Sequence, residues 1–388
     1  MAELDLKLKT LLGNHIENAL GYLGGNLSEA RKKSIEYYLG DKLGTEIDGR
    51  SQVVSTDVSD TIESILPNLL RIFTASDKVV KCEPVTAEDV PLSEQATAYL
   101  NHVFYKDNDG FQLLYNFFKD ALIEKNGFLK IYWDESESVE FETYENLSKA
   151  DKDALNDTKD EIEIIEEEEF IDEKAKEEFN NLLEQYREQG VEIPDAKEPD
   201  FTLYNCKIKR TKKHGKIKIE SVPPEEFLID RNAKTIQDAD FVSHKVLMSR
   251  SDLVAMGYDE EEVKNLPASS DDIYNTEDMV RQRNVDEYPV DNYTQGQNTK
   301  VLIYESYVKY DYDEDGIAEL RKIVSAGDDG SIVLENMPCD NIPFVTVTPI
   351  PMPHRFYGRS VSELVEDIQL MKSTVMRQLL DNMYLTNN

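Results

Sequence analysis

The sequence predicts an α+β protein, in which a mainly helical core is followed by an antiparallel β subdomain and a long amphipathic C-terminal helix. Three observations predict this class. Apolar residues recur three or four positions apart through much of residues 1–133, they alternate with polar residues over residues 201–209 and 215–221, and they form one unbroken helical stripe after residue 359. The length of 388 residues and the 40% hydrophobic content are sufficient for folded cores.

The region 1–133 is expected to be mainly helical. Periodicity predicts helices over residues 4–23, 26–39, 55–73, 93–105 and 111–124, and strands over residues 78–84 and 127–133. Gly24 and Gly25 should end the first helix, and Gly40 should cap the second. Pro67 is expected to kink or divide the third helix, because proline donates no backbone hydrogen bond.

The region 134–200 carries the largest charge excess. It holds 26 acidic and 7 basic residues, which is more than half of the formal net charge of −35. Phe179, Leu182, Leu183 and Tyr186 nevertheless keep a helical spacing, so we expect an acidic helical insertion that is solvated. The alternative is a charged surface that meets a basic partner.

The region 201–300 is expected to be rich in strands and to contain a polar loop over residues 267–300. Residues 201–209 and 215–221 alternate like two strands around a turn at 210–214, which predicts a basic hairpin. Further strands are predicted over residues 227–230 and 241–248, followed by a short helix that ends at Gly257. The hairpin residues that could contact phosphate, or the acidic segment of a neighbouring chain, are Lys207, Lys209, Arg210, Lys212 and Lys213.

The region 301–358 is expected to form a small antiparallel sheet, with strands over residues 301–310, 317–324, 331–335 and 343–349. Asp311, Asp313 and Asp315, followed by Gly316, match the first half of a calcium-binding loop. The match fails at its twelfth position, which is Lys322 instead of glutamate. A turn built from Asp and Gly explains the same residues, so this metal site is only a weak candidate.

The region 359–388 is predicted to be a single helix of about 25 residues, or roughly 37 Å. Ser360 and Glu363 form a possible capping box at its start. Its apolar stripe is Val361, Leu364, Val365, Ile368, Met371, Val375 and Leu379, continued by Met383. This stripe needs a partner, which is either the rest of the same subunit or a neighbouring subunit. The helix is therefore a candidate for packing within an oligomer.

Composition and motifs exclude several classes of function. A pI near 4.5 excludes general binding to nucleic acids, because such binding depends on Lys and Arg side chains that contact the phosphates. The three cysteines are far apart and odd in number, which argues against a disulfide scaffold or a zinc site. The chain has neither a secretion signal nor an apolar run long enough to span a membrane. Its five histidines lie in no catalytic signature, so we expect no enzyme and no cofactor.

Several strings together resemble the portal proteins of tailed bacteriophages, particularly those of short-tailed phages. The strongest runs from Pro343-Phe-Val-Thr-Val-Thr through His354-Arg-Phe-Tyr-Gly358-Arg-Ser-Val and on to Asp367-Ile-Gln-Leu-Met-Lys and Arg377-Gln-Leu-Leu-Asp-Asn-Met-Tyr. The weaker strings are Glu36-Tyr-Tyr-Leu-Gly40, Gly49-Arg-Ser-Gln-Val-Val-Ser55 with Asp57, Pro67 and Phe73, Pro223-Pro-Glu-Glu-Phe227 with Asp230, and residues 311–320.

The resemblance implies a homo-oligomeric ring of twelve subunits at one capsid vertex. Double-stranded DNA passes through such rings during packaging and ejection. A helical stem and clip face the terminase and the tail, and a mixed wing lies outside. On this basis the β-rich region 201–300 is expected to be wing-like, and the C-terminal helix to begin the channel-proximal region. ATP hydrolysis would belong to the terminase.

The same resemblance implies capsid, scaffold, tail and head-completion proteins as partners. It places the protein in the virion, and in the host cytoplasm during assembly. Such portals are usually longer, so we expect a C-terminally truncated chain. The alternatives are an acidic calcium-binding structural or adhesion module, resting on Asp311, Asp313 and Asp315, and, after it, a metal-dependent hydrolase.

Overall fold

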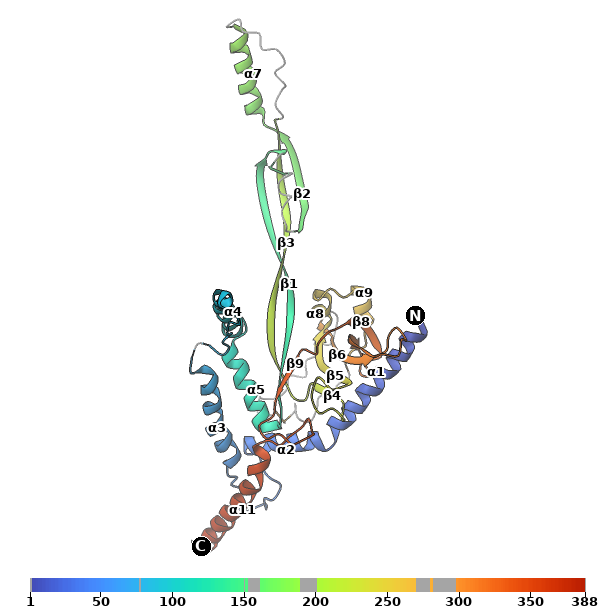
Figure 1. Ribbon diagram of the computed structural model, residues 1–388. Coiled ribbons are helices and arrows are strands. Elements are labelled where there is room, and N and C mark those ends of the chain that lie inside the picture. Colours follow the sequence, from blue (N-terminus) through green and yellow to red (C-terminus); the bar gives the residue numbers. More distant parts are fainter. Residues whose placement is uncertain are drawn as a thin grey trace. The chain divides into compact units, whose positions relative to one another are not determined.

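The computed structural model describes residues 2–76, 78–149, 151–152, 161–188, 201–269, 280–281 and 298–387. The chain forms two compact units, which are Met1–Tyr132 with Lys218–Asn388, and Trp133–Ile217. Helices and antiparallel sheets occur together, which confirms the α+β class (Figure 1). In the described part of the chain, no helix combines the length and the apolar character that crossing a membrane requires.

The first unit contains most of the helices. Its N-terminal helices are α1 (Ala2–Tyr22), the π-helix η1 (Leu23–Leu27), α2 (Ser28–Leu39), α3 (Asp57–Thr74), the 3₁₀ turn η2 (Ala87–Asp89), α4 (Val90–His102), the π-helix η3 (Val103–Asp107) and α5 (Gly110–Glu124). Its later helices are α8 (Arg250–Ala255), α9 (Glu260–Lys264) and α11 (Ser362–Asn387). Gly40 follows α2 with a left-handed φ of 75°, which confirms it as the cap.

A five-stranded antiparallel sheet lies in the same unit. Its order is β4 (Phe227–Ile229), β5 (Phe241–Ser249), β6 (Lys300–Tyr310), β7 (Glu319–Ala326) and β8 (Ile332–Pro338). Helix α1 packs Leu8, Leu12 and Ile16 against Phe241 and Tyr304 of this sheet. The apolar stripe predicted for α1 is thus buried against the sheet.

A second core joins α3 and α5. Ile62 and Leu66 of α3 are almost fully buried and pack with Phe117 and Leu122 of α5. Helix α3 continues through Pro67 without being divided, contrary to the possibility raised from the sequence. Its buried stripe runs past the proline on both sides, so packing offsets the one missing hydrogen bond.

Residues 78–84 do not form the predicted strand. Side chains of α4 accept hydrogen bonds from their backbone instead. Asn101 Oδ1 accepts from the amides of Val79 and Val80, and Thr97 Oγ1 accepts from Cys82. These amides are satisfied without a neighbouring strand, so no sheet is required.

The second unit, Trp133–Ile217, is built on long strands. It takes in most of β1 (Gly127–Leu147) and β3 (Thr202–Val222), with β2 (Glu161–Ile171) and α7 (Glu173–Glu188) between them. The acidic segment and the basic stretch, which the sequence analysis assigned to different regions, both belong to this unit. Helix α7 confirms the helical spacing that begins at Phe179, but the glutamate run before it is a strand.

The basic stretch is one continuous strand, so the predicted hairpin around residues 210–214 is wrong. Gly215 does not turn the chain. A Cβ at this position would lie 2.1 Å from Cζ2 of Trp133, so the glycine makes room for the indole ring. The strand predicted over residues 343–349 also differs, because β9 (Phe344–Val347) pairs with β1 and not with β8. The predicted polar loop lies largely outside the described residues.

Candidate assembly site

Helix α11 begins with the capping box predicted from the sequence. Ser360 Oγ accepts the amide of Glu363 at 3.1 Å, and the Glu363 carboxylate accepts the amide of Ser360 at 3.3 Å. Lys125 Nζ lies 2.8 Å from the same carboxylate. The start of α11 is therefore tied to the end of α5, and its direction is set by local hydrogen bonds.

Polar side chains make up much of the inward face of α11, beside Val361, Val365 and Leu370. Ser362, Gln369 and Ser373 have no exposed surface. Gln369 accepts a hydrogen bond from the amide of Val58 at 2.8 Å and donates one to the carbonyl of Tyr37 at 2.9 Å. Ser373 Oγ accepts from the amide of Ser55 at 3.0 Å. These side chains satisfy backbone groups at the start of α3 and the end of α2.

Ionic contacts also join α11 to the segment that precedes α3. Arg377 donates to the carbonyl of Val53 and to Thr45 Oγ1, both at 2.8 Å, and pairs with Glu46. Lys372 pairs with Asp57 at 2.6 Å. The segment before α3 thus lies along α11 and is held to it by side chains rather than by a strand pairing.

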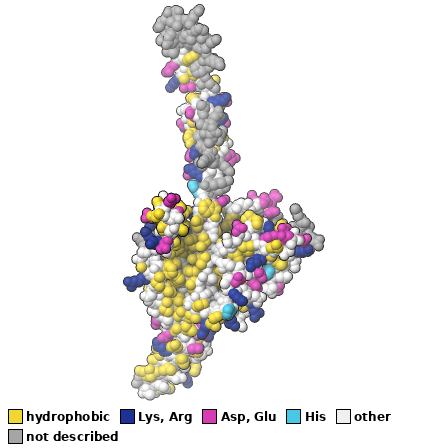
Figure 2. All heavy atoms as spheres, in the orientation of Figure 1, with side chains coloured by type: hydrophobic (Ala, Val, Ile, Leu, Met, Phe, Trp, Pro, Cys, Tyr) yellow, Lys and Arg dark blue, Asp and Glu magenta, His cyan; other side chains and the backbone are white. Residues whose placement is uncertain are grey.

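The outward face of α11 is apolar. Leu364, Ile368, Met371, Val375 and Leu379 are 47%, 53%, 61%, 64% and 60% exposed. Of the predicted stripe, only Val361 and Val365 pack against the helical core of their own unit. Figure 2 shows hydrophobic side chains gathered over the helical part of this unit and continuing along α11. Surface helices ordinarily place their apolar side inward, so this arrangement is reversed and leaves an apolar face in water.

Sequence reasoning missed the inward polar face. Its members recur at helical spacing, at positions 362, 369, 373 and 377, as regularly as the apolar stripe does. The period alone does not say which stripe faces the core. The signal was therefore present, but the sequence analysis left open which side of the helix faces its own subunit.

The predicted phosphate-contacting residues lie on β3, where described carboxylates surround them. Pairs are formed by Lys207 with Glu166 at 3.7 Å, Lys209 with Glu163 at 3.4 Å, Arg210 with Glu142 at 3.1 Å and Lys212 with Glu140 at 2.6 Å. The side chain of Lys213 lies outside the described residues. Two neighbouring strands thus supply the acidic partners from the same chain. Phosphate contact by these residues stays a prediction.

The Asp-rich turn brings its three carboxylates together. One oxygen each of Asp311, Asp313 and Asp315 lies within 4.8 Å of the others. Asp311 accepts hydrogen bonds from the amides of Asp315 and Gly316 at 3.1 and 2.9 Å, and Asp315 accepts from Ile317 at 2.7 Å. Turn geometry therefore accounts for the carboxylates, and cation binding here stays a prediction.

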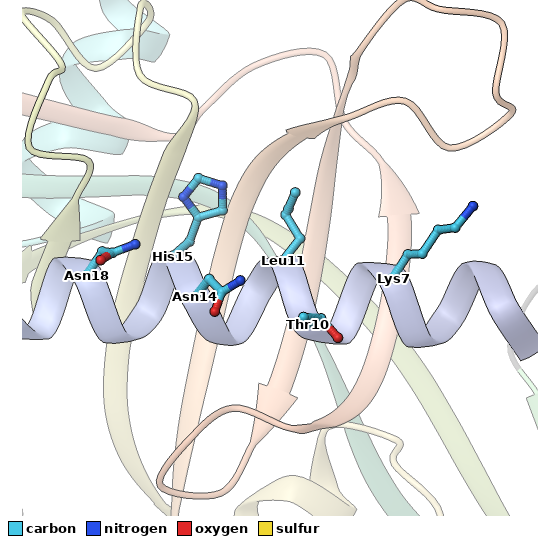
Figure 3. A pocket seen from close by; sticks show the side chains of 6 residues that line it. All are labelled: Lys7, Thr10, Leu11, Asn14, His15 and Asn18. Atoms are coloured by element: carbon cyan, nitrogen blue, oxygen red, sulfur yellow. The ribbon is translucent and has the colours of Figure 1, made fainter.

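A shallow hollow of about 440 Å³ lies along α1. It is lined by Lys7, Thr10, Leu11, Asn14, His15 and Asn18. Figure 3 shows Lys7, Leu11 and His15 pointing the same way from the helix. His15 stacks on Phe241 with ring centroids 5.2 Å apart, and burial lowers the pKa of its imidazole. The lining of the hollow brings no nucleophile, base and carboxylate together.

The most distinctive surface among the described residues is thus the exposed apolar face of α11. The chain matches the Phage SU10 portal protein family over residues 8–388, and it belongs to that family. This match covers essentially the whole chain and confirms the resemblance drawn from the sequence. The protein is thus a phage portal protein, of a family that is structural and not enzymatic, and the family implies an oligomeric ring at the capsid vertex.

Proposed function

We propose that twelve copies of this chain form the portal ring at one capsid vertex, and that double-stranded DNA passes through it during packaging and ejection. The observation that carries the proposal is the reversed amphipathicity of α11. Ser373 and Gln369 use their polar groups within the subunit, while Met371 and Val375 stay exposed. A neighbouring subunit in the ring is the partner that would remove these side chains from water.

The energetics favour such an interface. Burying apolar surface contributes about 25 cal/mol for each Å², so a stripe of five large side chains is a substantial contact. In a closed ring each subunit uses one surface to contact the next subunit and a different surface to contact the previous one. The stripe from Leu364 to Leu379 is proposed as the first of these surfaces, with Val361 and Val365 fixing the helix to its own subunit.

The charge of the chain suits a conduit that does not adhere to DNA. Each copy adds a formal charge of −35, and repulsion between carboxylates and phosphates would lower friction in the channel. On β3 the cations Lys209 and Lys212 face Glu163 and Glu140, which reduces their attraction for phosphate. Any contacts between the cations of β3 and the phosphates of DNA would then be brief.

The ring would meet other components of phage assembly. We propose the terminase large subunit as the motor that docks on it and hydrolyses ATP. Tail or head-completion proteins, capsid protein and scaffold protein are the other proposed partners. The ring would assemble in the host cytoplasm and remain at the portal vertex of the virion.

Negative-stain electron microscopy of the purified chain tests the proposal. We expect rings with a central hole close to the width of duplex DNA. The matched control is Leu364→Gln with Met371→Gln, which removes apolar surface from α11 without touching its polar face. Rings in the parent chain and single subunits in the variant would support the proposal. A monomer in both, at micromolar concentration and moderate salt, would contradict spontaneous ring formation.

The second candidate is an acidic calcium-binding structural or adhesion module. The convergence of Asp311, Asp313 and Asp315 favours it. Calorimetric titration with calcium separates the two functions, because the portal proposal expects no saturable site tighter than millimolar. Asp313→Asn is the control, since a real site would lose affinity when one ligand charge is removed.

A further inference from the structure

A buried cluster of charged side chains joins four parts of the first unit. Arg281 Nη1 lies 3.1 Å from Asp120, and its Nη2 lies 2.5 Å from Glu124 and 3.0 Å from Glu225. Asp120 and Glu124 are one turn apart on α5, and Glu225 lies in the turn that leads into β4. One guanidinium therefore holds three carboxylates from two separate elements.

Arg31, which belongs to α2, contributes a second guanidinium group to the same cluster. It is fully buried, donates to the carbonyl of Pro224 at 3.0 Å and lies over the ring of Tyr357. Its charge acts on both Asp120 and Glu124. The described groups of the cluster are thus three carboxylates and two guanidinium groups.

Glu124 is the deepest acid of the cluster. It is 2% exposed, and its Oε2 has no hydrogen-bond partner among the described residues. Burial raises the pKa of Glu124 well above its ordinary value, although the charge of Arg281 opposes this. Burial would lower the pKa of Arg281, but attraction to Glu124, Glu225 and Asp120 raises it. The charge of Arg281 therefore favours the ionised forms of Asp120 and Glu124.

The site is shaped for a guanidinium rather than for a small cation. Arginine presents its donors in a planar fork, which can contact several carboxylates at once, whereas lysine delivers a point charge. Arg281 enters from the surface, because a third of its side chain is exposed, while Val280 beside it is buried in the helical core. The receptor is built from α5 and the turn before β4, and Arg281 approaches it from a different segment.

We propose that Asp120, Glu124 and Glu225 form a receptor for a guanidinium group, which Arg281 occupies as a ligand supplied by the same chain. Without this ligand, three carboxylates would face one another and Asp120 and Glu124 would keep only the more distant charge of Arg31, so part of the buried charge would lose its compensation. When Arg281 is removed, the receptor accepts a guanidinium group from an external ligand. This assignment is independent of the proposed portal function, because it concerns the fold of a single subunit.

The test measures thermal unfolding of the full chain and its Arg281→Ala variant. We expect the variant to unfold at lower temperature and millimolar methylguanidinium to raise its midpoint. The wild type, whose receptor is filled, should not respond, and methylammonium at equal ionic strength should not replace the guanidinium. Equal responses of the wild type and the variant, or no response of either, would overturn the proposal.

A second variant keeps the test decisive if Arg281→Ala folds poorly, because the double variant of Arg281→Ala with Glu225→Gln is expected to be the more stable of the two. Glu225→Gln removes one of the three carboxylates. In the wild type it should destabilise the chain, because Arg281 loses a partner, whereas in the Arg281→Ala background it should stabilise the chain by relieving repulsion. This reversal of sign is specific to a shared cation. The same sign in both backgrounds would show that Glu225 acts independently of Arg281, against the proposed receptor.

Discussion

Arg377 and Glu46 form a buried ion pair, in which the closest nitrogen and oxygen lie 2.5 Å apart and both side chains are only 7% exposed. The pair joins α11 to the segment that precedes α3, across 331 positions of sequence. Arg377 also donates to the carbonyl of Val53 and the hydroxyl of Thr45. One side chain thus ties three residues of this segment to α11.

Replacing Arg377 with methionine should destabilise the chain by about 3–5 kcal/mol, because Glu46 would remain buried without its partner. Urea unfolding followed by circular dichroism measures this change. Arg359→Ala is the control. Arg359 is half exposed and pairs with Glu363 at 3.8 Å, so its loss should cost less than about 1 kcal/mol. Equal losses for both variants would show that the Arg377 pair contributes no more than a surface pair.

Substitutions on opposite faces of α11 should distinguish an effect on folding from an effect on assembly. Ser373→Ala leaves the amide of Ser55 without its acceptor and should cost about 1–3 kcal/mol in unfolding free energy. Val375→Asn changes an exposed side chain and should alter that free energy by no more than about 0.5 kcal/mol. Only the second substitution should abolish rings in light scattering. Intact rings in Val375→Asn would remove α11 from the interface.

Acid should loosen the segment that α11 holds. The hydrogen bond from Lys372 lowers the pKa of Asp57. Burial would raise the pKa of Glu46, but hydrogen bonds from backbone amides, including that of Leu43, and the charge of Arg377 lower it. A carboxylate whose folded pKa is depressed adds stability above the ordinary carboxylate range and loses it as the pH falls through the folded value.

Hydrogen exchange of residues 45–57, corrected for the intrinsic rate at each pH, measures this loosening. We expect protection to fall on acidification in the wild type. In Asp57→Asn the protection should already be lower at neutral pH and should change less with acid. Constant protection across the acid range would mean that these two carboxylates do not hold the segment.

The elements that the sequence predicted correctly are those set by local interactions. The capping box of Ser360 and Glu363 needs only residues three positions apart, and the cap at Gly40 needs one left-handed φ. The strands that became β5 and β6 are local segments rich in β-branched and aromatic residues. Such signals survive folding because neighbours in sequence remain neighbours in space.

The features that could not be predicted depend on distant partners. Gly215 reads as a turn residue until the position of Trp133 is known. The glutamate run is solvated as expected, with the Glu166 side chain 69% exposed, but only the fold shows that it pairs with β3. The receptor for Arg281 also depends on residues that are distant in the sequence. Asp120 and Glu124 share one helix face, but only the fold brings Arg281 to them.

The contact between Gly215 and Trp133 gives a spectroscopic test of the second unit. Trp133 is the only tryptophan of the chain, and its Nε1 donates to Glu135 at 3.2 Å. Gly215→Ala would place a methyl group 2.1 Å from Cζ2 of the indole, so the ring must move. We expect a shift in the emission maximum of Trp133, measured with excitation that is selective for tryptophan.

Gly21→Ala is the matched control for this substitution, because a Cβ at Gly21 meets nothing within 4 Å. It should leave the emission unchanged and stabilise α1 by about 0.4–1 kcal/mol, since alanine loses less backbone freedom on folding. An unchanged spectrum in Gly215→Ala would mean that β1 and β3 do not bring these two residues together. A shift in that variant alone would confirm that residues 210–214 continue one strand past Trp133, as an extended ladder and not as a hairpin.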